Sequence, residues 1–136
     1  MSDLELLARL IQCEAGGEGY QGMQAVASVI MNRVNISTGE YGRYNTIPDV
    51  IYAPRQFECA TNQRQSIPNM SPEQHHYDIA NWAINGGRLA DLGDALWFFN
   101  PYSPNCRPTF PNNNGYFVTR IGDHCFYNPA DSYHST

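Results

Sequence analysis

One glutamate, Glu14, ends an apolar helical stripe, in a position where a carboxylate could act as a general acid. Leu7, Ile11 and Glu14 follow one another at spacings of three and four, which places them on one face of a helix. Burial on that face disfavours the charged carboxylate and raises its pKa. An acid that is still protonated near neutral pH can donate a proton to a leaving oxygen. The pattern therefore indicates that Glu14 is a candidate general acid.

Two other interpretations of these acids stay open from the residues alone. A half-buried Glu14 could be a structural ion-pair partner of Arg33 or Arg55. Glu18, four residues further along, could be the second carboxylate of a glycosidase. Equally, it could place a negative charge at the N-terminus of the next helix, where the helix dipole favours it.

An aromatic and polar run over residues 97–102 offers a second kind of chemistry, the binding of sugars. Aromatic faces stack on the apolar faces of sugar rings, and Tyr102 could serve in this way. Asn100 offers both donors and an acceptor to hydroxyl and acetamido groups. Alternate members of the run must face the core, so we expect about half of them to be structural.

Histidines and cysteines could instead suggest a zinc centre, with His75, His76, His124 and Cys125 as candidate ligands. Adjacent histidines on a helix point in different directions, and the cysteines form no C-x-x-C pair. We therefore expect no metal and no cofactor, and a solvated helix face for the histidine pair. The sequence also lacks a glycine-rich phosphate loop and a serine nucleophile elbow.

The bulk composition narrows the class of ligand. The chain has 136 residues and a net charge of −5, so we expect one catalytic domain over residues 1–136 and no basic face for nucleic acid. Only 15% of the residues are charged, against an ordinary quarter. A neutral, amide-rich surface suits an uncharged polar ligand such as a sugar. We expect no membrane span and no signal peptide.

Hydrophobic periodicity predicts helices first and a small antiparallel sheet last, which makes an α+β fold. Ser71 is the expected N-cap of the last helix, with Pro72 in its first turn and Gln74 closing a capping box. Gly122 and Asp123 are the expected hairpin turn. An ordered turn is expected over 54–58, helices over 3–14, 20–34, 50–52 and 72–85, and strands over 96–99, 116–119 and 124–127.

Five stretches together make the sequence resemble a known family. They are LARLIQCEAGGE (7–18), GMQAVASVIMNRV (22–34), VIYAPRQFE (50–58), WFFNP (97–101) and HCFYNP (124–129). These stretches closely resemble the SleB/CwlJ family of spore cortex-lytic cell-wall hydrolases. Without a recognisable peptidoglycan-binding module or signal peptide, the chain is more similar to the CwlJ branch.

The resemblance implies cleavage of spore-cortex peptidoglycan during germination, in a compact fold similar to lysozyme and lytic transglycosylases. The family's catalytic glutamate falls on Glu14, which would act alone as acid and then base at the bond between N-acetylmuramic acid and N-acetylglucosamine. The expected product is a 1,6-anhydro sugar. Within or beside the matched stretches lie the residues that we expect to bind substrate: Glu18, Gln56, Phe57, Asn100 and Tyr102.

Three alternatives accompany this reading: a hydrolytic muramidase or glucosaminidase using the same glutamate, a non-catalytic peptidoglycan-binding coat protein, and a zinc amidase. From spacing alone the four cysteines allow three pairings, or four reduced thiols. Cys13 and Cys59 stand where we expect small residues other than cysteine in this family, so a Cys13–Cys59 bridge is the second expectation. The family pattern favours Cys106–Cys125. It also implies synthesis in the mother-cell cytosol and deposition at the boundary of spore coat and cortex, through a coat protein partner.

Overall fold

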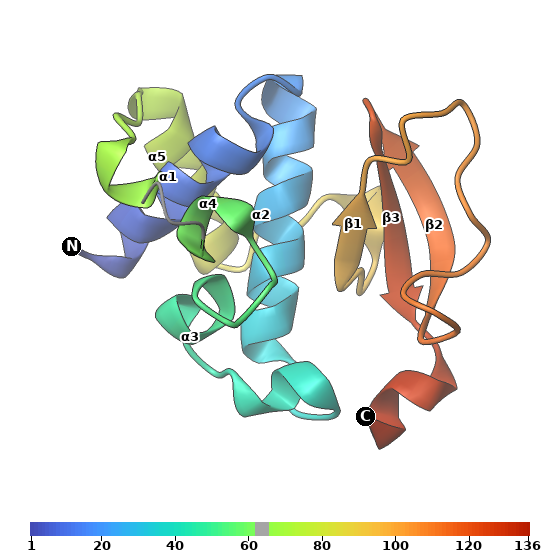
Figure 1. The fold of residues 1–136 in the computed structure, drawn as a ribbon. Coiled ribbons are helices and arrows are strands. Elements are labelled where there is room, and N and C mark those ends of the chain that lie inside the picture. Colours follow the sequence, from blue (N-terminus) through green and yellow to red (C-terminus); the bar gives the residue numbers. More distant parts are fainter. Residues whose placement is uncertain (62–65) are drawn as a thin grey trace.

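The computed structural model describes residues 1–61 and 66–136, and it separates helices from strands in space. Figure 1 shows the helices on one side, the sheet on the other, and the long helix α2 between them. The expected α+β class, mainly helical with a small antiparallel sheet near the C-terminus, is confirmed. The helices are α1 (Asp3–Ala15), α2 (Gly19–Asn35), α3 (Ile47–Ile51), α4 (Glu58–Thr61) and α5 (Gln74–Ile84), and the strands are β1 (Trp97–Phe99), β2 (Gly115–Ile121) and β3 (His124–Pro129).

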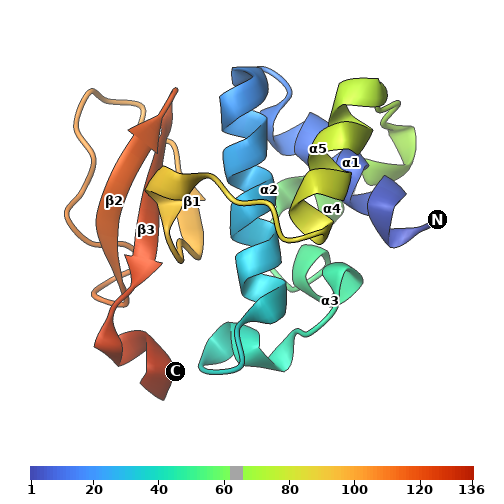
Figure 2. The ribbon, with the colours of Figure 1, turned by 180° about the vertical axis from the view of Figure 1, so that it is seen from behind.

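Helix α2 is apolar on two faces because it separates two parts of the core. Val26 and Ile30 pack into the cluster that α1, α3 and α5 share. On the other face, Ala25 and Val29 pack with Phe126 of β3. Figure 2 shows α2 from behind, with α5 on one side and the sheet on the other. Helix α2 thus fixes the position of the sheet relative to the other helices.

Helix α1 forms as its sequence predicts. Ser2 caps it, since the backbone N–H of Glu5 donates to the Ser2 hydroxyl at 3.1 Å. Leu7 and Ile11 are fully buried against the helical core. The helix ends at Ala15, and Gly16 follows it. Its last turn therefore carries Glu14 out of the core towards the surface.

The start of α5 differs from the prediction. The N-cap is Glu73, and His76 completes the capping box by accepting the Glu73 backbone N–H at 2.9 Å on its Nδ1 atom. Ser71 and Pro72 stay outside the helix, and the Ser71 carbonyl accepts a hydrogen bond from the Gln12 side chain. His76 is buried, so the expectation of a solvated histidine pair is wrong for this residue. A capping histidine imitates the glutamate or glutamine that usually closes the box.

The sheet has the order β1-β3-β2, and both pairings are antiparallel. Gly122 and Asp123 connect β2 to β3, as expected, and Gly122 has a φ of 57° that favours glycine. An aromatic cluster with Tyr41, Trp97 and Tyr133 fills the space beside this sheet. The central strand β3 meets α2 through Phe126.

Both favoured disulfides form. Cys106–Cys125 ties the long connection between β1 and β2 to β3. Cys13–Cys59 joins the last turn of α1 to α4 across 46 positions of sequence. All four cysteines form disulfides, so the alternative of four reduced thiols is wrong. The second bridge lies directly beside Glu14, which makes it part of the candidate site.

Candidate active site

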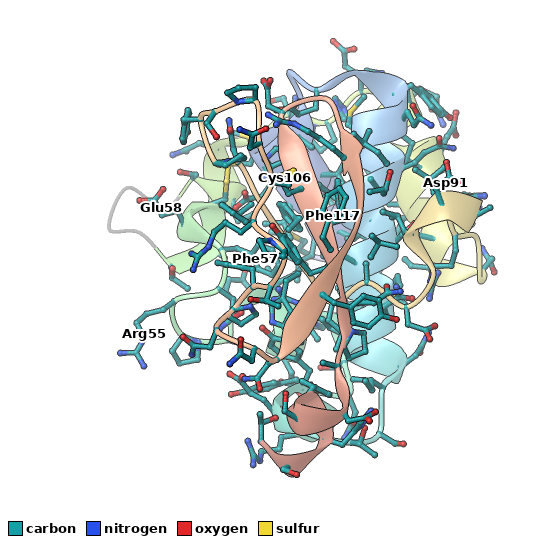
Figure 3. The ribbon with its side chains drawn as sticks, turned by 90° about the vertical axis from the view of Figure 1, so that its right-hand side faces the viewer. Arg55, Phe57, Glu58, Asp91, Cys106 and Phe117 are labelled. Carbon is teal, nitrogen blue, oxygen red and sulfur yellow. A yellow bond between two sulfur atoms is a disulfide. The ribbon has the colours of Figure 1, made fainter. Side chains whose placement is uncertain are left out.

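Glu14 faces a hollow of about 550 Å³ in the helical side of the molecule, which we call the acid hollow. Helix α1 supplies Glu14, helix α4 supplies a second acid, and the turn before α4 supplies the remaining wall. In Figure 3, Arg55 and Glu58 project outward on the same side of the molecule, while Phe57 lies between them and points inward. The lining residues are Glu14, Arg55, Gln56, Glu58 and Thr61.

The surroundings of Glu14 favour its protonated form. Burial is the largest influence and raises the pKa of the carboxyl, and the negative charge of Glu58 raises it further. A hydrogen bond from the Cys59 backbone and the more distant charge of Arg33 act in the opposite direction. The net direction is upward from the ordinary value of 4.5. The direction of this shift suits a side chain that donates a proton into the hollow.

The alternative of a structural ion pair is not supported. Among the residues that the structure describes, neither Arg33 nor Arg55 lies within ion-pair distance of Glu14. Arg33 is fully buried and donates to the Leu96 carbonyl at 2.7 Å and to Gln56 at 3.0 Å. Glu14 therefore keeps its raised pKa with no neutralising partner among residues 1–61 and 66–136.

The turn that positions Gln56 depends on a backbone shape that is unusual for arginine. Pro54 and Arg55 are the central residues of a β-turn, closed by a hydrogen bond from Gln56 N–H to the Ala53 carbonyl at 3.3 Å. Arg55 has a φ of 59°, and glycine or asparagine normally takes this position after proline. The ordered turn expected over 54–58 is present. Its geometry carries Gln56 into the acid hollow.

Two of the residues expected to bind substrate hold the structure together around the site. Phe57 is 3% exposed and packs its ring 6.4 Å from that of Phe98. Glu18 accepts the Asp123 backbone N–H at 3.4 Å and lies 3.5 Å from His124. It thus joins the start of α2 to the β2–β3 turn. Neither side chain lines the acid hollow, and their contact with substrate stays a prediction.

Asn100 and Tyr102 line another hollow, together with Ser103, Arg120 and Asp123. Asn100 accepts the Tyr102 backbone N–H at 2.8 Å, which shapes the start of this connection. The Tyr102 ring is 90% exposed, so one of its faces is available for stacking. This hollow shares no lining residue with the acid hollow, so the structure does not bring these two residues to Glu14.

Sequence reasoning missed Glu58 as a neighbour of Glu14. The signal was in the chain: Glu14 follows Cys13 and Glu58 precedes Cys59. Once those cysteines are paired, the two acids must lie at one site. Within the described residues, no three His, Cys, Asp or Glu side chains gather as metal ligands, and no helix is long and apolar enough to span a membrane.

Comparison with known proteins finds similar chains with assigned names. A model of the cell wall hydrolase family matches residues 17–127, a range that holds Gln56, β1, β2 and most of β3 but begins after Glu14. The chain is 35% identical to cell wall hydrolase CwlJ of Bacillus subtilis over 129 residues, which cover 95% of this chain and 87% of that protein. It is 33% identical to the spore cortex-lytic enzyme of Bacillus cereus, covering 92% of this chain and 44% of that protein.

Two solved structures have a similar fold. One is the catalytic domain of the germination-specific lytic transglycosylase SleB from Bacillus anthracis, with a TM-score of 0.72, 30% identity and 93% coverage of both chains. The other is the catalytic domain of Bacillus cereus SleB, with the same score and identity, covering 93% of this chain and 89% of that one. The expected fold, similar to lysozyme and lytic transglycosylases, is confirmed.

Proposed function

Because this chain belongs to the cell wall hydrolase family, we propose that it cleaves spore-cortex peptidoglycan as a lytic transglycosylase, with Glu14 as its single acid and base. The observation that carries the proposal is a half-buried carboxyl with a raised pKa that opens into a hollow. One solved relative is a germination-specific lytic transglycosylase, and both its reaction and its role in germination transfer to this chain as part of the proposal.

In the first step, protonated Glu14 donates its proton to the glycosidic oxygen that follows N-acetylmuramic acid. The bond from that oxygen to the anomeric carbon breaks, and N-acetylglucosamine leaves as a neutral alcohol. The acetamido group of the muramic acid stabilises the positive anomeric carbon, so no protein nucleophile is needed. The raised pKa of Glu14 supports this role, because the acid must be protonated when substrate binds.

In the second step, the Glu14 carboxylate removes the proton from the C6 hydroxyl of the same sugar. The C6 oxygen then bonds to the anomeric carbon and closes the 1,6-anhydro ring. Glu14 ends the cycle protonated again, so no water is consumed. The Cys59 backbone hydrogen bond supports this step, because it stabilises the carboxylate between the two proton transfers.

Substrate contacts form the rest of the proposal. Gln56 lies in the acid hollow and would hold the sugar beside the cleaved bond. Asn100 and Tyr102 would bind a more distant sugar of the same strand, with the exposed tyrosine ring as a stacking surface. Phe57 would support the wall from behind, and Glu18 would fix the start of α2.

A hydrolytic outcome is the second candidate, and Glu58 is the observation that favours it. A second carboxylate in the same hollow could act as a base for water or as a nucleophile, as in glycosidases with two acids. Mass spectrometry of the released muropeptides separates the two outcomes. A terminal sugar that lacks one water indicates transglycosylation, and a reducing end indicates hydrolysis.

The test of Glu14 itself is Glu14→Gln, assayed for release of soluble muropeptides from cortex fragments. We expect a folded protein whose cleavage rate falls by at least about a hundredfold, the usual scale of general acid catalysis. Glu5→Gln is the control, because Glu5 lies on the same helix in a half-buried pair with Arg9, outside the acid hollow. Near-normal cleavage by Glu14→Gln would refute the assignment. Binding without cleavage by the unchanged protein would favour a non-catalytic coat protein.

The site of action is also a proposal. Curated relatives include enzymes named for the spore cortex, and we place this protein at the boundary of coat and cortex, held there by a coat protein. Fractionation of spores with an antibody against the chain tests this location. Recovery of the protein from the spore core alone would contradict it.

A further inference from the structure

A second hollow adjoins the acid hollow, because Arg55 and Gln56 line both. We call it the aromatic hollow. Its volume is about 280 Å³, and rings from β1 and from the connection after it form one wall. Its remaining lining residues are Arg33, Glu40, Tyr41, Trp97, Phe98, Phe110 and Pro111. A glycan strand that crosses the acid hollow can therefore place its next sugar against these rings.

Buried groups fix the orientation of the Gln56 amide between the two hollows. The Gln56 Oε1 atom accepts Arg33 Nη1 at 3.0 Å and the Tyr41 hydroxyl at 3.0 Å. Trp97 Nε1 donates to the same tyrosine hydroxyl at 3.1 Å, so the tyrosine's own hydrogen is directed at Gln56. Arginine can only donate, so the amide oxygen must face it. The Nε2 group is consequently turned away from the core.

The Gln56 Nε2 group keeps donor capacity for a ligand. Its one contact among the described residues is a long bond of 3.4 Å to the Pro54 carbonyl. An amide nitrogen carries two hydrogens, so at least one can point into the hollows. The amide is thus a donor whose direction is set before substrate arrives, and such preorganisation reduces the entropic cost of binding.

Burying the charge of Arg33 costs free energy, and this cost indicates that the orientation of the Gln56 amide serves the function of the protein. Its guanidinium is fully buried, and burial lowers its pKa because the charged form loses water. The rings of Tyr41 and Phe57 lie 4.3 Å and 5.2 Å from it. In the described part of the chain no carboxylate pairs with it. An apolar side chain would fill this space at lower cost, but it could not orient Gln56.

We propose that the aromatic hollow binds an N-acetylated sugar next to the cleaved bond, and that Gln56 Nε2 donates to its acetamido oxygen. Arg33 and Tyr41 are positioning residues that act through Gln56. The acetamido group suits this site because its carbonyl accepts a hydrogen bond and its methyl group packs on rings. This inference rests on the proposed function and names its substrate selectivity.

The same geometry rejects a de-acetylated sugar. A free amino group is protonated near neutral pH, so it would present more donors to the Gln56 donor. It would also meet the positive charges of Arg33 and Arg55, which the single carboxylate of Glu40 offsets only in part. Unpaired donors and like charges both disfavour binding. The hollow therefore selects N-acetylglucosamine over glucosamine.

The test is binding of two ligands to the Glu14→Gln protein by calorimetry: a tetramer of N-acetylglucosamine and its fully de-acetylated counterpart. We expect the acetylated tetramer to bind at least about tenfold more tightly, a difference of about 1.4 kcal/mol. This first comparison changes nothing around Gln56, so it does not depend on the folding of a further variant. Equal affinity for the two tetramers would overturn the proposal.

Two substitutions added to this background test the amide. Gln56→Glu keeps the size and both accepted hydrogen bonds but removes the donor, so it should abolish the preference for the acetylated tetramer. Tyr41→Phe removes one of the two groups that fix the amide, and it should weaken acetylated binding severalfold. When Tyr41→Phe is made in the protein that keeps Glu14, kcat should change less than KM. Gln21→Glu, the same chemical change at an exposed residue that lines neither hollow, should leave the preference intact. An unaltered preference in Gln56→Glu would contradict the role of the amide.

The two proposals fail separately. Cleavage by Glu14→Gln would refute the acid role and leave the measured ligand preference as it is. If Glu14→Gln no longer cleaves but binds the acetylated and de-acetylated tetramers equally, the aromatic hollow is refuted as the acetyl site and the acid role stays intact.

Discussion

Removal of the Cys13–Cys59 bridge should affect both the stability and the activity of this protein. The bridge joins the residue before Glu14 to the residue after Glu58. The Cys59 backbone also donates a hydrogen bond to the Glu14 carboxyl. The perturbation is the double substitution of Cys13 and Cys59 by serine. Its matched control is the same change at Cys106 and Cys125, whose bridge lies at the sheet.

The expected loss of stability follows from the length of chain that each bridge closes. The separation is 46 residues for Cys13–Cys59 and 19 for Cys106–Cys125. Loop-closure entropy then gives about 4 kcal/mol for the first bridge and about 3 kcal/mol for the second. Domains have about 5–15 kcal/mol of total stability. We therefore expect both variants to fold at low temperature, with similar losses that differ by only about 1 kcal/mol.

Activity should separate the two variants where stability does not. Without Cys13–Cys59, Glu14 and the Cys59 N–H are no longer held in register, and misplacement by about 1 Å can cost about a hundredfold in rate. Free energies of unfolding come from urea titration without reductant, and cleavage is measured where both variants are folded. We expect a loss of at least about tenfold from the first variant and little from the control. Equal losses from both variants would refute a specific role for this bridge in positioning Glu14.

Three further outcomes follow from the site. Arg55→Gly should be about 1 kcal/mol more stable to thermal unfolding than Arg55→Ala, because both remove the side chain but only glycine relieves the φ of 59°; equal stabilities would contradict this. The raised pKa of Glu14 makes wild-type stability decrease as pH rises from 4.5 through the folded-state pKa. Over that pH range the free energy of unfolding of Glu14→Gln, measured by urea titration, should therefore increase relative to that of the wild type. A difference that stays constant with pH would refute this expectation. Glu58→Gln should lower the pKa of Glu14 and move the alkaline limb of the cleavage profile to lower pH; an unmoved limb would show that Glu58 does not act on Glu14.

Local patterns were enough to predict most of the fold. The stripe through Leu7 and Ile11 is apolar on one face only, so periodicity gives the helix and the place of Glu14 on it. The turn at Gly122 is equally local, since few residues other than glycine adopt its φ. Elements of this kind depend on neighbours within a few positions, and a single sequence contains that information.

The start of α5 and the role of Arg33 could not be predicted because each depends on distant partners. Ser71 has the chemistry of an N-cap, but Gln12 of α1 binds its carbonyl and the helix begins later. Arg33 looked like a possible partner of Glu14, yet its donors go to Leu96 and Gln56. In both cases the competing hydrogen bond spans the chain and is decided only by tertiary packing.

The balance of influences on Glu14 argues for one carboxyl that performs both proton transfers. Burial and Glu58 favour the protonated form, which suits donation but opposes the ionised state that must follow. The Cys59 backbone hydrogen bond and the positive charge of Arg33 act the other way. An acid that must donate a proton and then recover one needs a pKa near the working pH, so that neither form is costly. The opposing contributions to the Glu14 pKa come here from fixed groups, without the movement of any side chain. In this view Glu58 tunes the pKa of Glu14 and is not required as a second catalytic group.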